Sequence, residues 1–257
     1  MTKVVQITDL HLVSDRTQPL RDIYTWDTFE AVLADIEVKH SDYALLVITG
    51  DIADDEALST YQQLRDALGD RLDRCCLIPG NHDNRDHLSK TFPAHFSAGT
   101  DTLDFVTHAG GSASPWRIVG IDTQRTGAVD GHITDAQVEW LGLQFASGEL
   151  PTLVFQHHPP GPIGVAWVDK LGFEAHDAYF SLLSTHGVAA VAAGHVHQAS
   201  ESTINSVPFY TTPSTCTQFG TSDDPVFLPG GWGYRVFELD ETTFKTSVVR
   251  VTQLPDH

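Results

Sequence analysis

Short apolar runs alternate along the chain with amphipathic stretches. The runs predict buried strands over residues 3–8, 43–49, 74–79, 116–121, 152–156 and 187–194. After the first run, Trp26, Phe29, Leu33 and Ile36 recur at three- and four-residue steps, which predicts a helix over residues 25–40. Strands that alternate with helices are typical of a layered α/β fold.

Capping signals mark two further helices. Thr134 and Gln137 have the spacing of a capping box before an apolar stretch, and Gly148 follows where that helix would end. A second predicted helix begins at Asp177 and stops at Gly187. Because each lies between two predicted strands, both fit the same α/β alternation.

The last part of the chain has a different pattern. Apolar and polar positions alternate there, with short turns at residues 205–206 and 240–241, which predicts antiparallel strands within residues 201–214, 233–239 and 244–251. The expected fold class is therefore mixed α/β. No internal repeat, low-complexity tract or long linker divides the sequence, so we expect residues 1–257 to form a single domain.

Five of the predicted strands are followed directly by side chains that bind metal ions or transfer protons. These strands end in Asp9 and His11, in Asp51, in Asn81, His82 and Asp83, in His157 and His158, and in His195 and His197. In open α/β sheets, ligand sites form beyond the carboxyl ends of the strands. We therefore expect these side chains, although far apart in the sequence, to meet at one place.

The mixture of side chains predicts a two-metal site. Carboxylate, imidazole and amide oxygen groups suit ions such as Mn, Fe and Zn, whereas a softer site would use cysteine. Two ions about 3.5–4 Å apart can share one carboxylate and grip a phosphate, and Asp51 is the expected shared ligand. Gly50, Gly80 and Gly194 each precede an expected ligand, where glycine allows close backbone approach.

Charge and composition narrow the choice of partners. Fifteen Lys and Arg against 34 Asp and Glu give a net charge of −19, which disfavours nucleic-acid polymers and membrane surfaces as partners. No stretch approaches the roughly 20 apolar residues of a membrane span, and no secretory signal is evident, so we expect a cytoplasmic protein. Cys75, Cys76 and Cys216 are expected to be reduced thiols. The sequence does not indicate an oligomeric state.

The motifs at the strand ends resemble those of the calcineurin-like metallophosphoesterase superfamily. The matching motifs are Asp9-Leu10-His11, Gly50-Asp51, Gly80-Asn81-His82-Asp83, His157 and Gly194-His195-Val196-His197. The resemblance implies a four-layer α/β/β/α sandwich with two divalent or trivalent metal ions, Fe or Mn first and Zn as a further candidate. It assigns one metal to Asp9, His11, Asp51 and His197, and the other to Asp51, Asn81, His157 and His195.

Segments outside the metal motifs resemble the bacterial class III cyclic-nucleotide phosphodiesterases, the 3′,5′-cyclic-AMP phosphodiesterase group. These segments are HHPPGPIGVAWVDKLGFE, AGHVHQA, TPSTCTQF and PGGWGYRVFELD. The resemblance implies hydrolysis of 3′,5′-cyclic AMP to 5′-AMP by in-line attack of a metal-bridging hydroxide. The alternative is the same mechanism on glycerophosphodiesters, other small phosphodiesters or phosphomonoesters. A non-catalytic scaffold would be expected to lack some ligands, and none is missing.

Several side chains are expected to act on the substrate or to support the ligands. Asn81, His82 and His197 are expected to contact it, with a cationic His82 as the acid that protonates the leaving alkoxide. Asp83 is expected to orient His82 and favour its imidazolium form. His158 is expected to orient ligands rather than bind metal. The alternative for His82 is a purely structural ring.

The loops leave alternatives open. Trp167 and Phe173 either stack on a nucleobase or pack their loop onto the core. Arg16 and Arg21 follow His11 and contact either phosphate or solvent, and neither receives a role. The acidic stretch GDIADDE after Gly50 either weakens anion binding or forms the exposed first turn of a helix, and we favour the helix.

Overall fold

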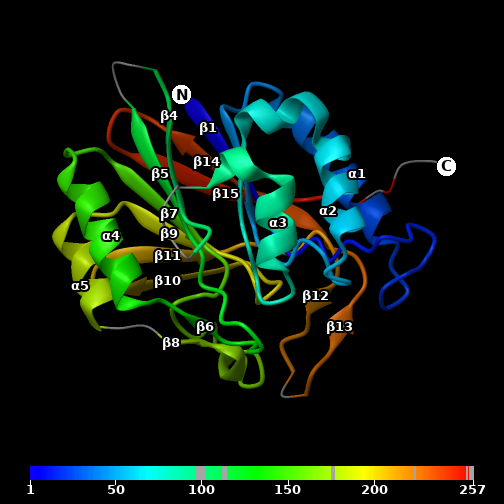
Figure 1. Ribbon diagram of the computed structural model, residues 1–257. Helices are drawn as coiled ribbons and strands as arrows, with labels where there is room; N and C mark the ends of the chain where they lie inside the picture. Colours follow the sequence, from blue (N-terminus) through cyan, green and yellow to red (C-terminus); the bar gives the residue numbers. More distant parts are fainter. Residues whose placement is uncertain (97–101, 112–114, 175–176, 223, 253, 255–257) are drawn as a thin grey trace.

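The computed structural model describes residues 1–96, 102–111, 115–174, 177–222, 224–252 and 254 (Figure 1). Its first sheet has five strands, of which the middle one, β1, pairs in parallel with β2 and antiparallel with β14. Their order is β15 (Phe244–Arg250), β14 (Gly233–Leu239), β1 (Thr2–Ile7), β2 (Leu45–Thr49) and β3 (Cys75–Ile78).

The second sheet has six strands and a parallel centre. Strands β11, β9, β7 and β5 run parallel, and an antiparallel strand flanks them at each edge. Their order is β10 (Ser200–Ile204), β11 (Val207–Thr211), β9 (Ala190–Ala193), β7 (Thr152–Gln156), β5 (Trp116–Ile121) and β4 (Phe105–Ala109). The described residues also form two small two-stranded sheets. In one, β6 (Gly131–His132) pairs with β8 (Phe173–Glu174); in the other, β12 (Gln218–Phe219) pairs with β13 (Phe227–Leu228).

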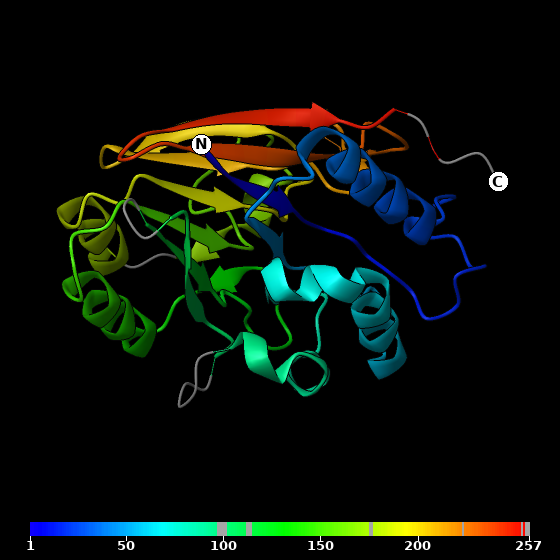
Figure 2. The same ribbon diagram turned by 90° about the horizontal axis from the view of Figure 1, so that it is seen from above.

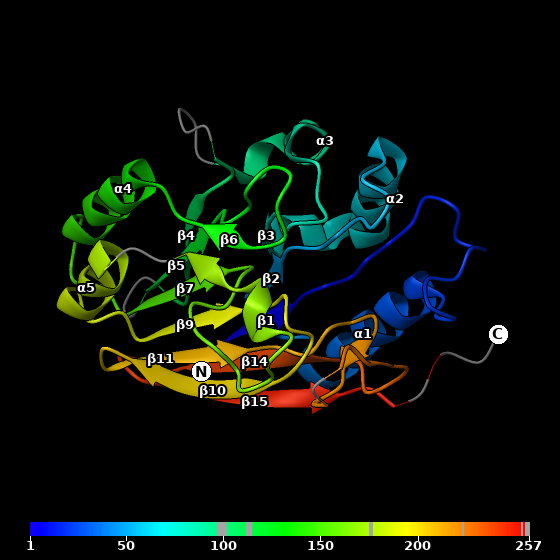
Figure 3. The ribbon, with the colours of Figure 1, turned by 90° about the horizontal axis from the view of Figure 1, so that it is seen from below.

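In the described ranges, five α-helices pack on the outer sides of the two sheets. They are α1 (Thr25–His40), α2 (Leu58–Leu68), α3 (Arg85–Thr91), α4 (Asp135–Ala146) and α5 (Asp177–Thr185), with 3₁₀ turns at Gly69–Arg74, Pro93–His95 and Asp169–Leu171. In Figures 2 and 3, α4 and α5 lie on one side of the strands and α1 and α2 on the other. None of the helices in the described ranges is long and apolar enough to cross a lipid bilayer.

The alternation of side chains along each strand produces the layers. Val4 and Val47 point between the sheets, where they join Ile118 and Phe155 of the second sheet in one buried cluster. The neighbouring positions of β1 and β2 point outward and pack against α1 and α2, and the outer face of the second sheet packs in the same way against α4 and α5. The expected α/β/β/α sandwich is confirmed, because buried faces with a period of two require a partner on each side.

The predicted elements recur with small shifts of their ends. The capping box at Thr134 and Gln137 is present, and α5 begins at Asp177. The turn at residues 205–206 joins β10 and β11 with positive φ at both positions, as a two-residue hairpin requires. Strand β4 was not predicted. It lies at the edge of its sheet, with His108 exposed, so its sequence lacks the apolar run of a buried strand.

Candidate metal centre

The expected ligands gather where the strands end. Asp9 and His11 follow β1, Asp51 follows β2, Asn81 follows β3, His157 follows β7, and His195 and His197 follow β9. Five of them have left-handed backbone angles, with φ of 53° at Asp9, 46° at His11, 49° at Asp51, 68° at His195 and 51° at His197. Such conformations are uncommon outside glycine and concentrate at functional sites.

Glycines allow these strand ends to approach one another. A Cβ atom built on Gly194 would lie 1.9 Å from Thr8 Oγ1 and 2.8 Å from Asp9 Oδ2. A Cβ atom on Gly80 would lie 2.3 Å from Asp51 Oδ1. Both distances are far below van der Waals contact, so only glycine fits. The expectation of close backbone approach is confirmed at these positions.

The first ligand cluster contains Asp9, His11, Asp51 and His197, all buried. The Nε2 atoms of His11 and His197 are 3.2 Å apart, His197 Nε2 lies 3.3 Å from Asp9 Oδ1, and His11 Nε2 lies 3.6 Å from Asp51 Oδ2. Ligands bound to one ion at about 2.1 Å lie roughly 3.0–3.5 Å from each other. The spacing therefore fits a single ion, with the set that the resemblance implies.

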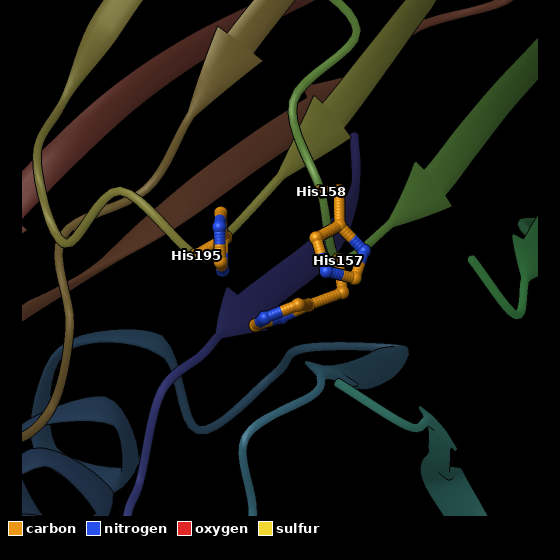
Figure 4. A group of neighbouring side chains, drawn as sticks. All are labelled: His157, His158 and His195. Carbon is orange, nitrogen blue, oxygen red and sulfur yellow. The ribbon is translucent and has the colours of Figure 1, made fainter. Parts of the chain in front are cut away.

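The second cluster surrounds His157. Its Nε2 atom lies 3.2 Å from Asn81 Oδ1 and 3.3 Å from Asp51 Oδ1. Its ring centroid is 5.0 Å from that of His195 (Figure 4). Asp51 therefore presents one carboxylate oxygen to each cluster, Oδ2 towards His11 and Oδ1 towards His157.

His158 lies beside this second cluster, with its ring 4.6 Å from that of His195 (Figure 4). Its Nδ1 atom is 2.8 Å from Thr123 Oγ1, and its Nε2 atom is 3.0 Å from the Val129 carbonyl oxygen. Both ring nitrogens are therefore occupied by hydrogen bonds. This arrangement agrees with a supporting role for His158 rather than with metal binding.

Each of the four expected histidine ligands has one ring nitrogen held by an oxygen acceptor. The pairs are His11 Nδ1 with Asp54 Oδ1 at 2.9 Å, His157 Nδ1 with Thr49 O at 2.8 Å, His195 Nε2 with Leu171 O at 3.1 Å and His197 Nδ1 with Thr217 O at 2.6 Å. Such a bond fixes the tautomer and leaves the other nitrogen free to bind metal. The donor set thus fits two ions.

The site attracts positive charge: burial lowers the pKa of His157, but Asp51 outweighs burial and raises it to about 9, so a bound metal ion would replace a proton there. Burial raises the pKa of the Asp51 carboxyl, but His157 and His11 outweigh burial and hold that pKa well below its usual range. Burial lowers the pKa of His195 to about 4, with a further contribution from His157. The carboxylate is therefore ionised and the His195 imidazole neutral at pH 7, which are the forms that bind metal.

The carboxylate beside the His82 ring belongs to Asp54 rather than to Asp83, which was expected to orient that ring. The Asp83 carboxylate accepts hydrogen bonds from the backbone N–H groups of Ile52, Ala53 and Gly80 and from the Tyr61 hydroxyl. It therefore fixes the loop after β2 to the loop after β3. The orienting role expected of Asp83 is wrong in this respect, because the carboxylate 3.6 Å from His82 Nδ1 belongs to Asp54.

The acidic stretch after Gly50 is a loop, and the prediction of a helical first turn is wrong. Helix α2 begins at Leu58, and its first turn carries no acidic residue. Asp55 instead accepts hydrogen bonds from the backbone N–H groups of Ser14 and Ala57. Asp54 turns into the site between His11 and His82. Asp54 was not predicted from the sequence, because its place in the site depends on how this loop folds back towards His11.

His82 lies at the entrance of a cavity of about 230 Å³ above the ligands. Its side chain is 45% exposed, whereas the ligand histidines are buried. The cavity is also lined by Asn81, Asp54 and an outer wall that includes Leu20, Arg21, Val129, Leu171, Phe219 and Phe227. Asn81, His82 and His197, which were expected to contact substrate, all face this space.

The two aromatic residues considered for base stacking do not line this cavity. Trp167 packs behind Phe219, with ring centroids 4.9 Å apart, and Phe173 packs edge-on against Tyr179 at 6.0 Å. The packing alternative is therefore the correct one for both. The aromatic side chains in the cavity wall are Phe219 and Phe227, which the sequence analysis missed.

Comparison with known proteins agrees with this geometry. The model of the calcineurin-like phosphoesterase family matches residues 2–199. The chain is 30% identical over 228 residues to the 3′,5′-cyclic adenosine monophosphate phosphodiesterase CpdA of Vibrio vulnificus, covering 88% of this chain and 81% of that protein. It is 31% identical over 219 residues to the protein of the same name from Escherichia coli K12, covering 84% and 77%.

Solved structures share the fold at lower identity. The Plasmodium protein GAP50, described as the anchor in the inner membrane complex, superimposes with a TM-score of 0.63 and 14% identity over 99% of this chain and 86% of that one. The purple acid phosphatase PPD1 of yellow lupin gives a TM-score of 0.61 and 14% identity over 99% and 52%. With the family match over most of its length, the chain belongs to the calcineurin-like phosphoesterases.

Proposed function

We propose that this chain is a two-metal phosphodiesterase that hydrolyses 3′,5′-cyclic AMP to 5′-AMP. The single observation that carries the proposal is the pair of ligand clusters that share the Asp51 carboxylate at the floor of one open cavity. The names of the relatives from Vibrio vulnificus and Escherichia coli support the choice of substrate.

The proposed ligands are Asp9, His11, Asp51 and His197 for one metal ion, and Asp51, Asn81, His157 and His195 for the other. When bound, two ions would lower the pKa of a shared water and neutralise the charge on the phosphate; Fe and Mn suit these ligands, as does Zn. The buried carboxylates and the hydrogen-bonded imidazoles hold the ligand atoms in place before the ions arrive.

His82 is the proposed acid. In the reaction, the oxygen of water bonds to phosphorus, and the bond between phosphorus and the ribose 3′ oxygen breaks. That oxygen leaves as an alkoxide and needs a proton, which an imidazolium can donate. His82 is exposed to the cavity, and its Nδ1 atom lies 3.6 Å from Asp54 Oδ1, a contact that can orient the ring.

The outer wall of the cavity supplies a place for the nucleoside. Phe219 and Phe227 line the cavity and offer aromatic contacts to a base. Small linear diesters and phosphomonoesters need no such wall, which supports the choice of a cyclic nucleotide as the substrate. The acidic chain and the small cavity both argue against a nucleic-acid polymer.

The test is a panel of kcat/KM values with Mn, Fe or Zn supplied in turn. The substrates are 3′,5′-cyclic AMP, 2′,3′-cyclic AMP, glycerophosphocholine and a nitrophenyl phosphomonoester. The proposal predicts the highest kcat/KM for the 3′,5′-cyclic nucleotide. A value for glycerophosphocholine or the monoester far above that for cyclic AMP would replace the proposed substrate while leaving the metal chemistry intact.

A further inference from the structure

Arg21 stands out among the cations of this acidic chain. Among the described residues that line the cavity, it is the one with a permanent positive charge. Within the described part of the chain, its guanidinium makes no hydrogen bond or ion pair, and it lies over the Phe227 ring with Cζ 3.6 Å from the centroid. In a protein with 34 acidic residues, an unpaired arginine at a substrate cavity has its donors available for a ligand.

A series of ring contacts connects Arg21 with the metal ligand His197. The Phe219 ring lies parallel to that of the ligand His197, with centroids 4.0 Å apart and an interplanar angle of 12°. Phe219 meets Phe227 edge-on at 5.4 Å, and Arg21 covers Phe227. The cavity is thus lined by the ligand His197 and by Arg21, with Phe219 and Phe227 in contact between them.

The backbone fixes Arg21 in this position. Leu20 and Ile23 exchange two backbone hydrogen bonds, both of 2.9 Å, which closes a two-residue turn. Arg21 and Asp22 occupy its corners with φ of 50° and 65°. Arginine seldom adopts this conformation, which glycine, asparagine and aspartate favour. The turn therefore fixes the backbone of Arg21 at a conformational cost, and from there the guanidinium lies over Phe227.

We propose that Arg21 reads the base of the substrate and favours guanine, so that 3′,5′-cyclic GMP is a substrate at least as good as 3′,5′-cyclic AMP. This inference rests on the proposed function, because it needs the phosphate of a cyclic nucleotide at the metal centre. A guanidinium is a planar fork of donors with no acceptor. Guanine offers two neighbouring acceptors, O6 and N7, which that fork binds together, whereas adenine places a donor beside N7.

A terminal phosphate group on the ligand, rather than its base, is the other partner that the Arg21 guanidinium could bind. The observations favour the base, because a phosphate site normally gathers several cations or backbone N–H groups. Here Arg21 lies over Phe227 and follows Leu20 in the chain, and Phe227 in turn contacts Phe219. An aromatic and aliphatic surface around one arginine suits a purine, which needs stacking and an edge contact.

The experiment compares three substrates across matched variants. The substrates are cyclic GMP, cyclic AMP and methyl 4-nitrophenyl phosphate, a diester without a base. The variants are Arg21→Leu, Arg21→Lys and the control Arg16→Leu. Arg16 belongs to the same loop but lies on Trp26 at 3.7 Å and pairs with Glu30 at 2.9 Å, away from the cavity.

The expected results distinguish recognition of the base by the guanidinium from a general effect of the positive charge at residue 21. Arg21→Leu lowers kcat/KM for cyclic GMP by about tenfold or more, lowers that for cyclic AMP less, and leaves the base-free diester unchanged. Arg21→Lys shows the same change in the ratio of kcat/KM for cyclic GMP to kcat/KM for cyclic AMP, because a single ammonium group cannot bind two acceptors as the planar guanidinium does. Arg16→Leu changes none of the three values. Turnover of the base-free diester shows that each variant is folded.

Two results would overturn the inference. In the first, Arg21→Leu lowers kcat/KM equally for cyclic GMP and cyclic AMP, or Arg21→Lys keeps the full kcat/KM for cyclic GMP. Arg21 then does not distinguish the bases, and the proposed phosphodiesterase function stands. If the unmodified protein hydrolyses the base-free diester but neither cyclic nucleotide, the proposed function fails together with the role of Arg21.

Discussion

The Asp54 carboxylate lies 2.9 Å from His11 Nδ1, and the same oxygen lies 3.6 Å from His82 Nδ1. Asp54 therefore connects an expected metal ligand with the expected acid, although it binds neither metal nor substrate in the proposed reaction. Burial raises the pKa of Asp54, but the hydrogen bond with His11 outweighs burial and lowers it. The carboxylate is ionised at pH 7 and can orient both rings.

Replacing Asp54 should weaken both metal binding and acid catalysis. Asp54→Asn is expected to lower metal affinity or kcat/KM about 10–100-fold, because the bond to His11 Nδ1 loses its charge. Titration calorimetry with Mn measures the affinity, and Asp55→Asn is the control, since Asp55 bonds the Ser14 N–H and the Thr60 hydroxyl instead. Equal behaviour of the two variants would remove the role of Asp54.

The acid role of His82 depends on the leaving group. His82→Ala should lower kcat for 3′,5′-cyclic AMP by about 10²-fold or more, because the ribose alkoxide needs a proton. The loss should be much smaller for a nitrophenyl diester, whose leaving group is stable without one. His87→Ala is the control, since His87 bonds the Glu56 carbonyl oxygen at 2.9 Å. Similar losses on both substrates would leave His82 with a structural role alone.

Gly194 should tolerate no side chain. A Cβ atom there meets Thr8 Oγ1 at 1.9 Å, so Gly194→Ala is expected to lower the free energy of unfolding by about 1–3 kcal/mol and to impair metal binding. The control is Gly142→Ala in α4, where the nearest atom is Leu182 Cδ1 at 3.8 Å. That change should stabilise the protein slightly, since alanine favours a helix. Urea unfolding compares the two, and a neutral Gly194→Ala would contradict the close packing.

Asp104 should contribute less to the free energy of unfolding as pH rises from about 4 to about 6. Burial raises the pKa of Asp104 from 3.8 to about 6, so the folded protein holds a proton that the unfolded chain releases. This group's stabilisation is complete below pH 3.8 and is lost as pH rises through 6, an effect of about 2–3 kcal/mol. Asp104 is buried and accepts hydrogen bonds from the Asp122 N–H and from Gln137 Nε2.

Asp104→Asn should therefore remove this contribution, so that the free energy of unfolding of the variant, measured by urea unfolding at several pH values, changes relative to the unmodified protein between pH 4 and pH 6. The amide that replaces the carboxyl group remains uncharged throughout the range. Asp66→Asn serves as the control, because Asp66 is exposed beside Arg65. An unchanged slope between pH 4 and pH 6 in Asp104→Asn would show that Asp104 does not hold the proton.

The sequence predicted the parallel strands and the convergence of their ends, because both follow from local patterns and one rule of topology. It did not predict the side-chain contacts that depend on loops far apart in the sequence coming together. Asp83 follows His82 directly, which suggested a pair, but neighbouring residues point their side chains in different directions, and Asp83 bonds the Gly80 N–H instead. Asp54 reaches His11 because the loop after β2 folds back, which no spacing reveals.

The wall of the cavity was equally invisible in the sequence. Phe219 and Phe227 belong to the short strands β12 and β13, which pair with each other beyond the two main sheets (Figure 1). Trp167 was considered for base stacking from the sequence, but in the structure it packs against Phe219, and Phe219 rather than Trp167 lines the cavity. Which ring faces a cavity depends on this tertiary packing rather than on local pattern.

Two metal ions held between the strand ends are the basis of the proposed chemistry. The direct test is anomalous diffraction from crystals grown with manganese. We predict two peaks, one among Asp9, His11, Asp51 and His197 and one among Asp51, Asn81, His157 and His195, with Asp51 bound to both. A single peak, or two peaks without Asp51 between them, would contradict the proposal.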